Sequence, residues 1–235
     1  MATAGFRRER YRLSAEIVGY GRAAAEASLE GGDPGDIAMA HFVLGFSHLF
    51  HGSHEEAEAH MLTALRWGER IGDVTVLSRC LTYLTVSYRQ RGLVEEARRH
   101  GERSRQVSTA GGMDDYLGAA QANLAWVTWR EGRREEAERE AQAAVDLWRK
   151  LAVVYPYPFQ WQGLVILLAA SVERGAIQQG VEHARALIDP KQQLLPDTLT
   201  DFLARAAQAW DEGRTEQARE ELVRGLEAVQ RHGYL

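Results

Sequence analysis

Apolar and polar residues follow one another along this chain in a pattern that repeats every forty residues. Residues 84–97 read LTVSYRQRGLVEEA, which is typical of the end of one helix, a tight turn at Gly92 and the start of a second helix. The same pattern of residue types occurs at 44–57 and 124–137, so the turn glycines Gly52, Gly92 and Gly132 stand forty residues apart. A fixed period of this size predicts an all-α array of stacked helix pairs.

Two less regular units follow, with turns predicted at Gly175 and Gly213. The prolines of residues 155–159 and 190–196 cannot continue a helix, so longer loops are expected between these units. The chain is therefore predicted to form a single helical repeat domain over residues 1–235. Its expected parts are a partial unit at 1–33 and full units at about 36–73, 74–112, 114–153, 159–188 and 197–231.

In the first full unit, small residues predict close packing of the two helices, and a further pattern predicts where the second helix begins. Gly45, Ala57 and Ala64 recur at helical spacing, which allows its two helices to approach closely. Ser53 is followed three residues later by Glu56, the spacing of a capping box at the start of a helix.

The composition narrows the function classes. The 235 residues are 45% hydrophobic and 26% charged, which is ordinary for a globular chain, and the net charge is −5. An acidic balance argues against a broad nucleic-acid surface. No apolar run approaches the roughly 20 residues that span a bilayer, so a cytoplasmic chain without a membrane segment is expected. The single cysteine, Cys80, is expected to be a small buried hydrophobe, and no internal disulfide can form.

No constellation of catalytic residues stands out. The phosphate-binding patterns GxxxxGK[ST] and GxGxxG are absent from the sequence. Paired glutamates such as Glu95 and Glu96 recur in the first turn of each second helix, where negative charge meets the positive end of the helix dipole. We therefore expect neither enzymatic activity nor a cofactor.

The histidines offer one alternative chemistry. His48, His51 and His54 lie close together around the first turn, and three imidazoles can hold zinc. However, no carboxylate or thiol stands at clear ligand spacing, and histidines near the end of a helix also interact favourably with its negative dipole end. The expectation is that the chain holds no metal.

The repeat resembles the tetratricopeptide-repeat family. The resemblance rests on Leu44-Gly45, on Tyr88, on the five turn glycines and on the EEA or EQA triplets that end at Ala57, Ala97, Ala137 and Ala218. It implies an α-solenoid of antiparallel helix pairs, wound as a right-handed superhelix, with the first helix of each pair lining a concave side. The units are longer than the family's usual length of about 34 residues.

A narrower resemblance concerns the loops. Residues 155–161 (YPYPFQW), 187–196 and 232–235 look like the C-terminal repeat region of large bacterial signalling proteins, which carry a cyclase or DNA-binding module and a STAND-type ATPase before the repeats. This resemblance implies a sensor or partner-docking segment that belongs to a longer protein.

The leading hypothesis is a non-catalytic scaffold that binds a protein or peptide segment in its concave groove, within a bacterial signalling or transcription-regulatory protein. An alternative is a small-molecule sensor that uses the same groove, and homodimerisation through an exposed terminal unit is a further expectation. Aromatic and arginine side chains dominate binding hot spots. The expected groove residues are Phe46, Arg79, Arg89, Trp126, Trp129, Arg130 and Trp210.

Overall fold

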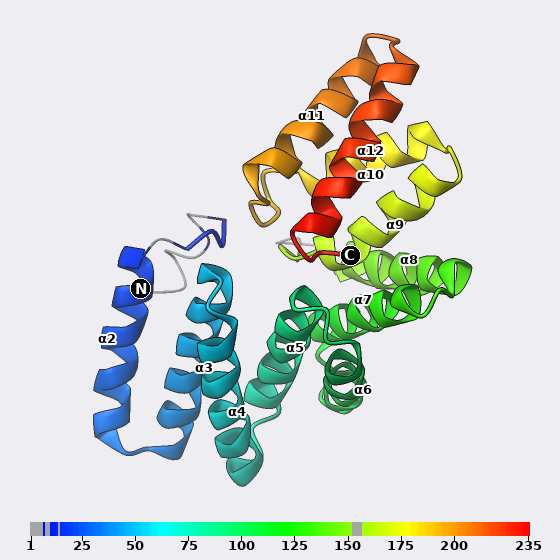
Figure 1. The fold of residues 1–235 in the computed structure, drawn as a ribbon. Helices are drawn as coiled ribbons and strands as arrows, with labels where there is room; N and C mark the ends of the chain where they lie inside the picture. The colour runs from blue at the N-terminus through cyan, green and yellow to red at the C-terminus, as the bar shows by residue number, and fades with distance from the viewer. Residues whose placement is uncertain (1–6, 8–9, 14, 152–156) are drawn as a thin grey trace.

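The computed structural model describes residue 7 and residues 10–13, 15–151 and 157–235, and the elements of this part of the chain are all helical. The helices follow one another as antiparallel neighbours and form a curved α-solenoid (Figure 1), which confirms the predicted fold class. They are α2 (Ala15–Gly31), α3 (Pro34–His51), α4 (His54–Ile71), α5 (Val74–Gln90), α6 (Val94–Ala110), α7 (Asp114–Arg130), α8 (Arg134–Leu151), α9 (Trp161–Glu173), α10 (Ile177–Leu187), α11 (Asp197–Asp211) and α12 (Thr215–Arg231).

The predicted turn glycines end the first helix of each pair. At Gly92 the backbone has φ of 71°, a left-handed conformation that costs glycine little. Its N–H bonds the Arg89 carbonyl at 2.9 Å, and the Leu93 N–H bonds the Tyr88 carbonyl at 2.9 Å, which is the pattern of a Schellman cap. All five predicted turn glycines have a positive φ.

One local prediction is right only in part. Ser53 is the N-cap residue of α4, but its side chain makes no capping hydrogen bond, and no capping box with Glu56 forms. The Ser53 N–H instead bonds the His48 carbonyl at 2.9 Å, as part of the cap that ends α3. The turn is so short that Ser53 belongs both to the cap that ends α3 and to the start of α4. Its backbone conformation is the one that the cap of α3 requires.

Small residues hold the helices of a pair close together, as expected. A Cβ built on Gly45 would lie 2.6 Å from Met61 Cγ and 3.0 Å from the Ala57 carbonyl oxygen, so α3 and α4 cross with no room for a side chain. Ala57 and Ala64 are fully buried at the same crossing. The division of the chain into units at the predicted residue numbers stays a prediction.

The order of contacts between helices defines the concave side. Helices α3, α5, α7 and α9 touch one another in series, whereas α4, α6 and α8 touch only their neighbours in sequence. The inner layer of a curved array is the more crowded one, so the first helices line the concave face. The last pair differs, because α9 and α10 contact α12 and α11 contacts only α10 and α12.

Two loops and the segment 10–13 cross the concave side. The Gln193 N–H bonds the Pro158 carbonyl at 2.8 Å, and the Trp161 indole N–H bonds Gln193 Oε1 at 2.8 Å, which ties the loop before α9 to the loop before α11. The Leu194 N–H bonds the Arg10 carbonyl at 2.9 Å. Residues 10–13 therefore meet the loop before α11 and bridge the two ends of the curved array. Of the predicted inter-unit loop, residues 155 and 156 lie outside the described part.

Candidate functional site

A pocket opens on the concave face, and we call it the Arg79 pocket. It has a volume of about 190 Å³ and is open to solvent between α3, α5 and α7. Most of its walls are apolar or aromatic, and none of the described residues that line it is a carboxylate. The lining residues are Arg7, Tyr11, Met39, Phe42, Val43, Phe46, Arg79, Tyr83, Tyr116 and Phe159.

Arg79 provides positive charge to this pocket. Its Nε donates to the Tyr116 hydroxyl at 3.2 Å, Nη1 lies 3.9 Å from the Met39 sulfur, and the guanidinium lies 5.7 Å from the centre of the Phe42 ring. Within the described residues no carboxylate forms an ion pair with Arg79. The described part of the pocket therefore combines an apolar cavity with an arginine that has no carboxylate partner there.

An aromatic cluster forms the floor of the pocket. Phe46 of α3 meets Tyr83 of α5 edge-to-face at 4.8 Å, and Phe159, from the loop before α9, lies 5.8 Å from Tyr83. Tyr11 covers the cluster, with its ring 4.6 Å from Phe159. Such ring pairs add about 0.5–1.5 kcal/mol each beyond area burial, so the floor is rigid. Phe46, predicted as a groove residue, lies here.

Arg89 lies deeper, in a polar network at the centre of the concave side, which we call the Arg89 network. Its Nε and Nη2 donate to the Tyr234 carbonyl at 3.2 and 2.7 Å, and Nη1 donates to the Gln162 carbonyl at 2.8 Å and to Asn123 Oδ1 at 3.2 Å. The side chain is 1% exposed, and burial lowers its pKa to about 9. The Asn123 amide donates to Gln162 Oε1 at 2.8 Å, which fixes the Asn123 oxygen toward Arg89.

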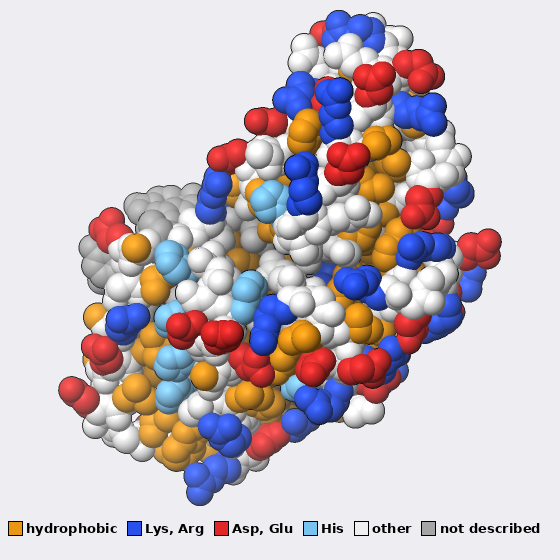
Figure 2. All heavy atoms as spheres, viewed as in Figure 1, with side chains coloured by type: hydrophobic (Ala, Val, Ile, Leu, Met, Phe, Trp, Pro, Cys, Tyr) orange, Lys and Arg blue, Asp and Glu red, His pale blue; other side chains and the backbone are white. Residues whose placement is uncertain are grey.

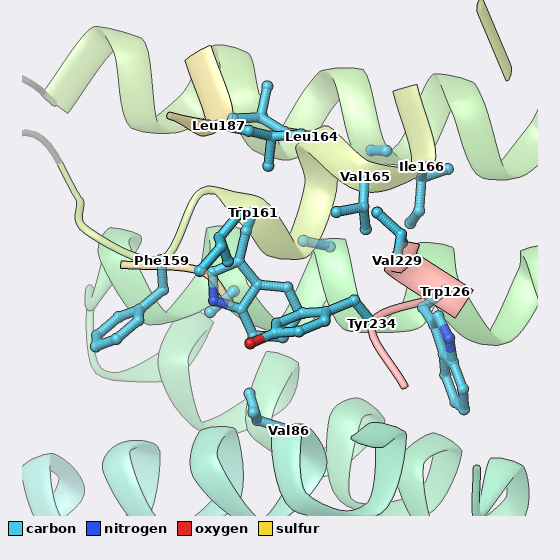
Figure 3. Packing of buried hydrophobic residues seen from close by; sticks show 14 of the residues in the cluster. Val86, Trp126, Phe159, Trp161, Leu164, Val165, Ile166, Leu187, Val229 and Tyr234 are labelled. Carbon is cyan, nitrogen blue, oxygen red and sulfur yellow. The ribbon is translucent and has the colours of Figure 1, made fainter. Parts of the chain in front are cut away.

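Apolar side chains surround Tyr234, and Figure 3 shows several of them. The Tyr234 and Trp161 rings meet edge-to-face with their centroids 4.6 Å apart, and Val86 of α5 lies nearby. The Arg89 guanidinium lies 5.0 Å from the Trp161 ring and 5.8 Å from the Trp126 ring. Arg89 of α5 is thus held by residues of two other helices, α7 and α9, and by the segment that follows α12.

The predicted tryptophan and arginine cluster of α7 is mostly buried. Trp126 is 0% exposed, and the Arg130 guanidinium covers it at 5.2 Å from the ring centre. Trp129 is 4% exposed and lies under Arg134 at 4.0 Å. The tryptophans fill space between helices, and only Arg130 of this group is exposed. Their role in binding stays a prediction.

Trp210 lies apart from the other predicted groove residues. It is half-buried on α11, which contacts only α10 and α12. The structure thus places Phe46 and Arg79 at the pocket, Arg89 and Trp126 at the network, and Trp210 at neither. A binding role for Trp210 stays a prediction.

Several residues of the two sites were not predicted from the sequence. Asn123 is a polar residue within an otherwise apolar helical run, and this pattern is the signal that points to a buried network. Tyr116 has no such signal, because a tyrosine on an amphipathic helix is ordinary. The contact between Tyr234 and Arg89 could not be predicted from the sequence pattern, because 145 residues separate the two.

The histidines are arranged differently from the predicted alternative. His54 Nδ1 lies 3.4 Å from the Ser87 hydroxyl, and His51 is exposed. The closest pair is His41 of α3 and His60 of α4, whose Nδ1 atoms lie 2.9 Å apart, with His48 stacked on His60 at 5.6 Å. Figure 2 shows that histidine side chains gather on one part of the face drawn there. No three potential ligands converge on a metal position among the described residues.

Charges elsewhere on the face shown in Figure 2 are mixed, with acidic and basic side chains interspersed over it. Several exposed ion pairs join helices that are neighbours in sequence, such as Arg185 of α10 with Asp211 of α11. Burial raises the pKa of Cys80 to about 12, so its thiol is not activated. Within the described residues no helix is both long and apolar enough for a membrane span.

Comparison with known proteins agrees with this architecture. Residues 117–152, which cover most of α7 and α8, match the tetratricopeptide repeat family. No curated protein matches the chain. The crystal structure of BtubC (BKLC) from P. vanneervenii has a similar fold, with a TM-score of 0.60, 17% sequence identity and coverage of 91% of each chain. At this identity the likeness concerns the fold alone. The matched repeat and the shared fold support a tetratricopeptide type of helical repeat for this chain.

Proposed function

We propose that this chain is a non-catalytic scaffold that binds a protein or peptide segment on its concave face, at the Arg79 pocket. Tetratricopeptide repeats generally bind protein or peptide partners, and this is the general function that the matched repeat supports. The observation that carries the proposal is the pocket itself, in which the Arg79 guanidinium, without a carboxylate partner among the described residues, stands beside an apolar cavity. A peptide segment with a hydrogen-bond acceptor next to an apolar side chain would bind the guanidinium through the acceptor and fill the cavity with the side chain.

The volume of the pocket favours a peptide over a small molecule. Sites for drug-sized ligands usually have volumes of about 300–1,000 Å³. The Arg79 pocket has about 190 Å³, which is room for one large side chain and not for a whole metabolite. A small-molecule sensor therefore remains the second candidate. A thermal-shift screen against metabolites separates the two, because a ligand that binds only the folded chain raises Tm in proportion to ln(1 + [L]/Kd).

The biological setting is part of the proposal. The resemblance of the loops at 155–161, 187–196 and 232–235 to bacterial signalling proteins supports a sensor or partner-docking segment of a signalling or transcription-regulatory protein in the cytoplasm. Homodimerisation through a terminal unit has less support, because the open face of α12 is charged apart from Val223, which is 39% exposed. Light scattering over a range of concentrations tests the oligomeric state.

The test compares two arginine variants that change the net charge equally. Arg79→Gln removes one of the two arginines that line the pocket, and Arg105→Gln removes an exposed cation from α6 on the convex side. On an array of peptides, Arg79→Gln should weaken the binding of captured sequences at least about tenfold, which corresponds to 1.4 kcal/mol. Arg105→Gln should leave binding unchanged. Equal binding by wild type and Arg79→Gln would remove the pocket from the proposal.

A further inference from the structure

Two polar side chains of the Arg79 pocket have hydrogen-bond donors to spare. Arg79 Nε donates to the Tyr116 hydroxyl oxygen at 3.2 Å, and Nη1 has only the Met39 sulfur, at 3.9 Å. Among the described residues, neither Nη2 nor the Tyr116 hydroxyl has an acceptor. Burial raises the pKa of Tyr116, so its hydroxyl stays protonated at neutral pH. The guanidinium and the hydroxyl thus form two neighbouring donors, which we call the Arg79–Tyr116 fork.

The walls around the fork offer it no negative charge. None of the described residues that line the pocket is a carboxylate, and Arg7 adds a second arginine to the lining. A carboxylate has two acceptor oxygens, so one carboxylate can accept from Nη2 and from the Tyr116 hydroxyl at the same time. Such charge-assisted bonds are roughly twice as strong as bonds between neutral groups. Charge complementarity therefore favours a carboxylate over a backbone carbonyl as the acceptor of the partner.

The walls of the pocket also favour a carboxylate that belongs to a side chain. Arg79 is half-buried, so an acidic side chain can reach it while the backbone of the partner stays outside the pocket. A carboxylate at the end of a chain would bring the backbone N–H of its own residue toward the fork. The described lining has no carboxylate or amide side chain to accept that N–H, and an unpaired backbone donor is costly when it is buried.

We propose that the Arg79–Tyr116 fork binds the side-chain carboxylate of one glutamate or aspartate within the partner segment, beside the apolar side chain that fills the cavity. This inference rests on the proposed function and names the chemistry of the acceptor in the same partner. Arg79 supplies the charge. Tyr116 supplies the second donor and holds Nε, so it also positions the guanidinium.

The first test uses the full chain and an array of short peptides whose ends are blocked by acetyl and amide groups. Sequences that the wild type captures should contain glutamate or aspartate. Replacing that residue in the peptide by glutamine or asparagine keeps its size and removes its charge, and should weaken binding at least about tenfold. With Arg79→Gln, the same replacement in the peptide should change binding less than about twofold, because the cation that reads the charge is gone.

The second test removes the hydroxyl of the fork. Tyr116→Phe should weaken binding of the acidic peptide roughly threefold to tenfold and leave binding of its glutamine or asparagine version unchanged. Tyr88→Phe is the matched control, because the Tyr88 hydroxyl donates to Glu58 at 2.9 Å, outside the pocket. It should leave the ratio of the two affinities as in wild type. If Tyr116→Phe loses its helical circular dichroism, Arg79→Lys replaces it, because lysine keeps the charge without Nε and should weaken the acidic peptide similarly.

The outcomes separate this inference from the proposed function. If captured peptides bind equally well with glutamine or asparagine, and Arg79→Gln still weakens them, the scaffold function stands and the carboxylate is excluded. Capture only of peptides with a free terminal carboxylate, on an array with unblocked ends, would also overturn the inference. A Tyr116→Phe variant that weakens acidic and neutral peptides equally would overturn the fork. If no captured peptide depends on Arg79, the pocket assignment of the proposed function falls as well.

Discussion

At the scale of single residues, the absence of a side chain sets how closely the helices pack. Gly118 of α7 faces Trp148 of α8, and a Cβ built on it would lie 2.5 Å from the indole Nε1 and 2.8 Å from Cε2. Trp148 is fully buried and donates its N–H to the Asp115 carbonyl at 3.0 Å. The ring is thus fixed on both sides and cannot move away from an added methyl group.

Gly118→Ala should therefore lower the free energy of unfolding by about 1–3 kcal/mol, the usual cost of overpacking a core. Gly19→Ala is the control, because Gly19 lies in the exposed part of α2 with no atom within 4 Å of the new Cβ. Alanine favours a helix over glycine by roughly 0.5–1 kcal/mol, so the control should gain stability. Urea denaturation of both variants measures the difference, and equal stabilities would contradict the close packing.

Arg89 makes the second prediction at this scale. Arg89→Met keeps much of the apolar stem but leaves the carbonyls of Gln162 and Tyr234 and the Asn123 oxygen without their donor. Each buried acceptor left unsatisfied costs about 1–3 kcal/mol. Chemical denaturation should show a loss of at least that size, whereas Arg130→Met, at an exposed site on α7, should cost less than about 1 kcal/mol. If Arg89→Met left the free energy of unfolding unchanged, the Arg89 network would not be what stabilises the concave centre.

At the scale of elements, the pair α3 and α4 contains groups that titrate near neutral pH. Burial lowers the pKa of His41, His48 and His60, with smaller contributions from Arg66 on α4 to His41 and from Arg22 on α2 to His48 and His60. Glu56 opposes the shift for His48 and His60. The folded pair therefore favours neutral imidazoles.

The sign of the pH effect follows directly. As the pH is lowered, these histidines bind protons near pH 6.5 in the unfolded chain but only at lower pH in the folded chain. Their contribution to stability is therefore complete above about pH 6.5 and is lost as the pH falls below it. His60→Gln should flatten the loss of stability between pH 7 and pH 5, because it removes one member of the close His41–His60 contact. His51→Gln, at the exposed end of α3, is the control for an ordinary histidine change. The urea midpoint at several pH values measures both, and an unchanged pH dependence in His60→Gln would contradict the assignment.

The same scale shows what could be predicted from the sequence. Gly52, Gly92 and Gly132 recur at a fixed interval, and a positive φ at each confirms that the interval marks turns. The pattern could not decide the role of Trp126, because an aromatic residue at helical spacing serves a core and a groove equally well. Contacts that close the array, such as Arg10 with Gln192 over 182 residues, have no counterpart in a forty-residue period.

At the scale of the whole molecule, the closure of the solenoid determines which part of the concave side is open. Tyr11 packs on Phe159 at 4.6 Å and on Phe46 at 6.2 Å, and so joins the first helix pair to the loop before α9. Nearby, Arg12 forms an ion pair with Asp197 at 2.7 Å, in which both side chains are exposed. The aromatic contact and not the ion pair should carry most of the closure.

Tyr11→Ala should therefore enlarge the molecule in small-angle X-ray scattering, because the ring that bridges the two ends is lost. Arg12→Gln should leave the radius of gyration unchanged, since an exposed ion pair contributes only about 0–1 kcal/mol. A wild-type radius of gyration in Tyr11→Ala would mean that the hydrogen bonds of residues 189–194 hold the ends together without the ring.

The most direct test of the central claim is to map the surface that a captured partner covers. Hydroxyl-radical footprinting reads the solvent exposure of Met39 and Tyr116, which line the Arg79 pocket, and of Trp67, which lies half-exposed on α4. We expect a bound partner to protect Met39 and Tyr116 and to leave Trp67 as reactive as in the free chain. Protection of Trp67 with no change at Met39 and Tyr116 would place binding on the convex side and contradict the account.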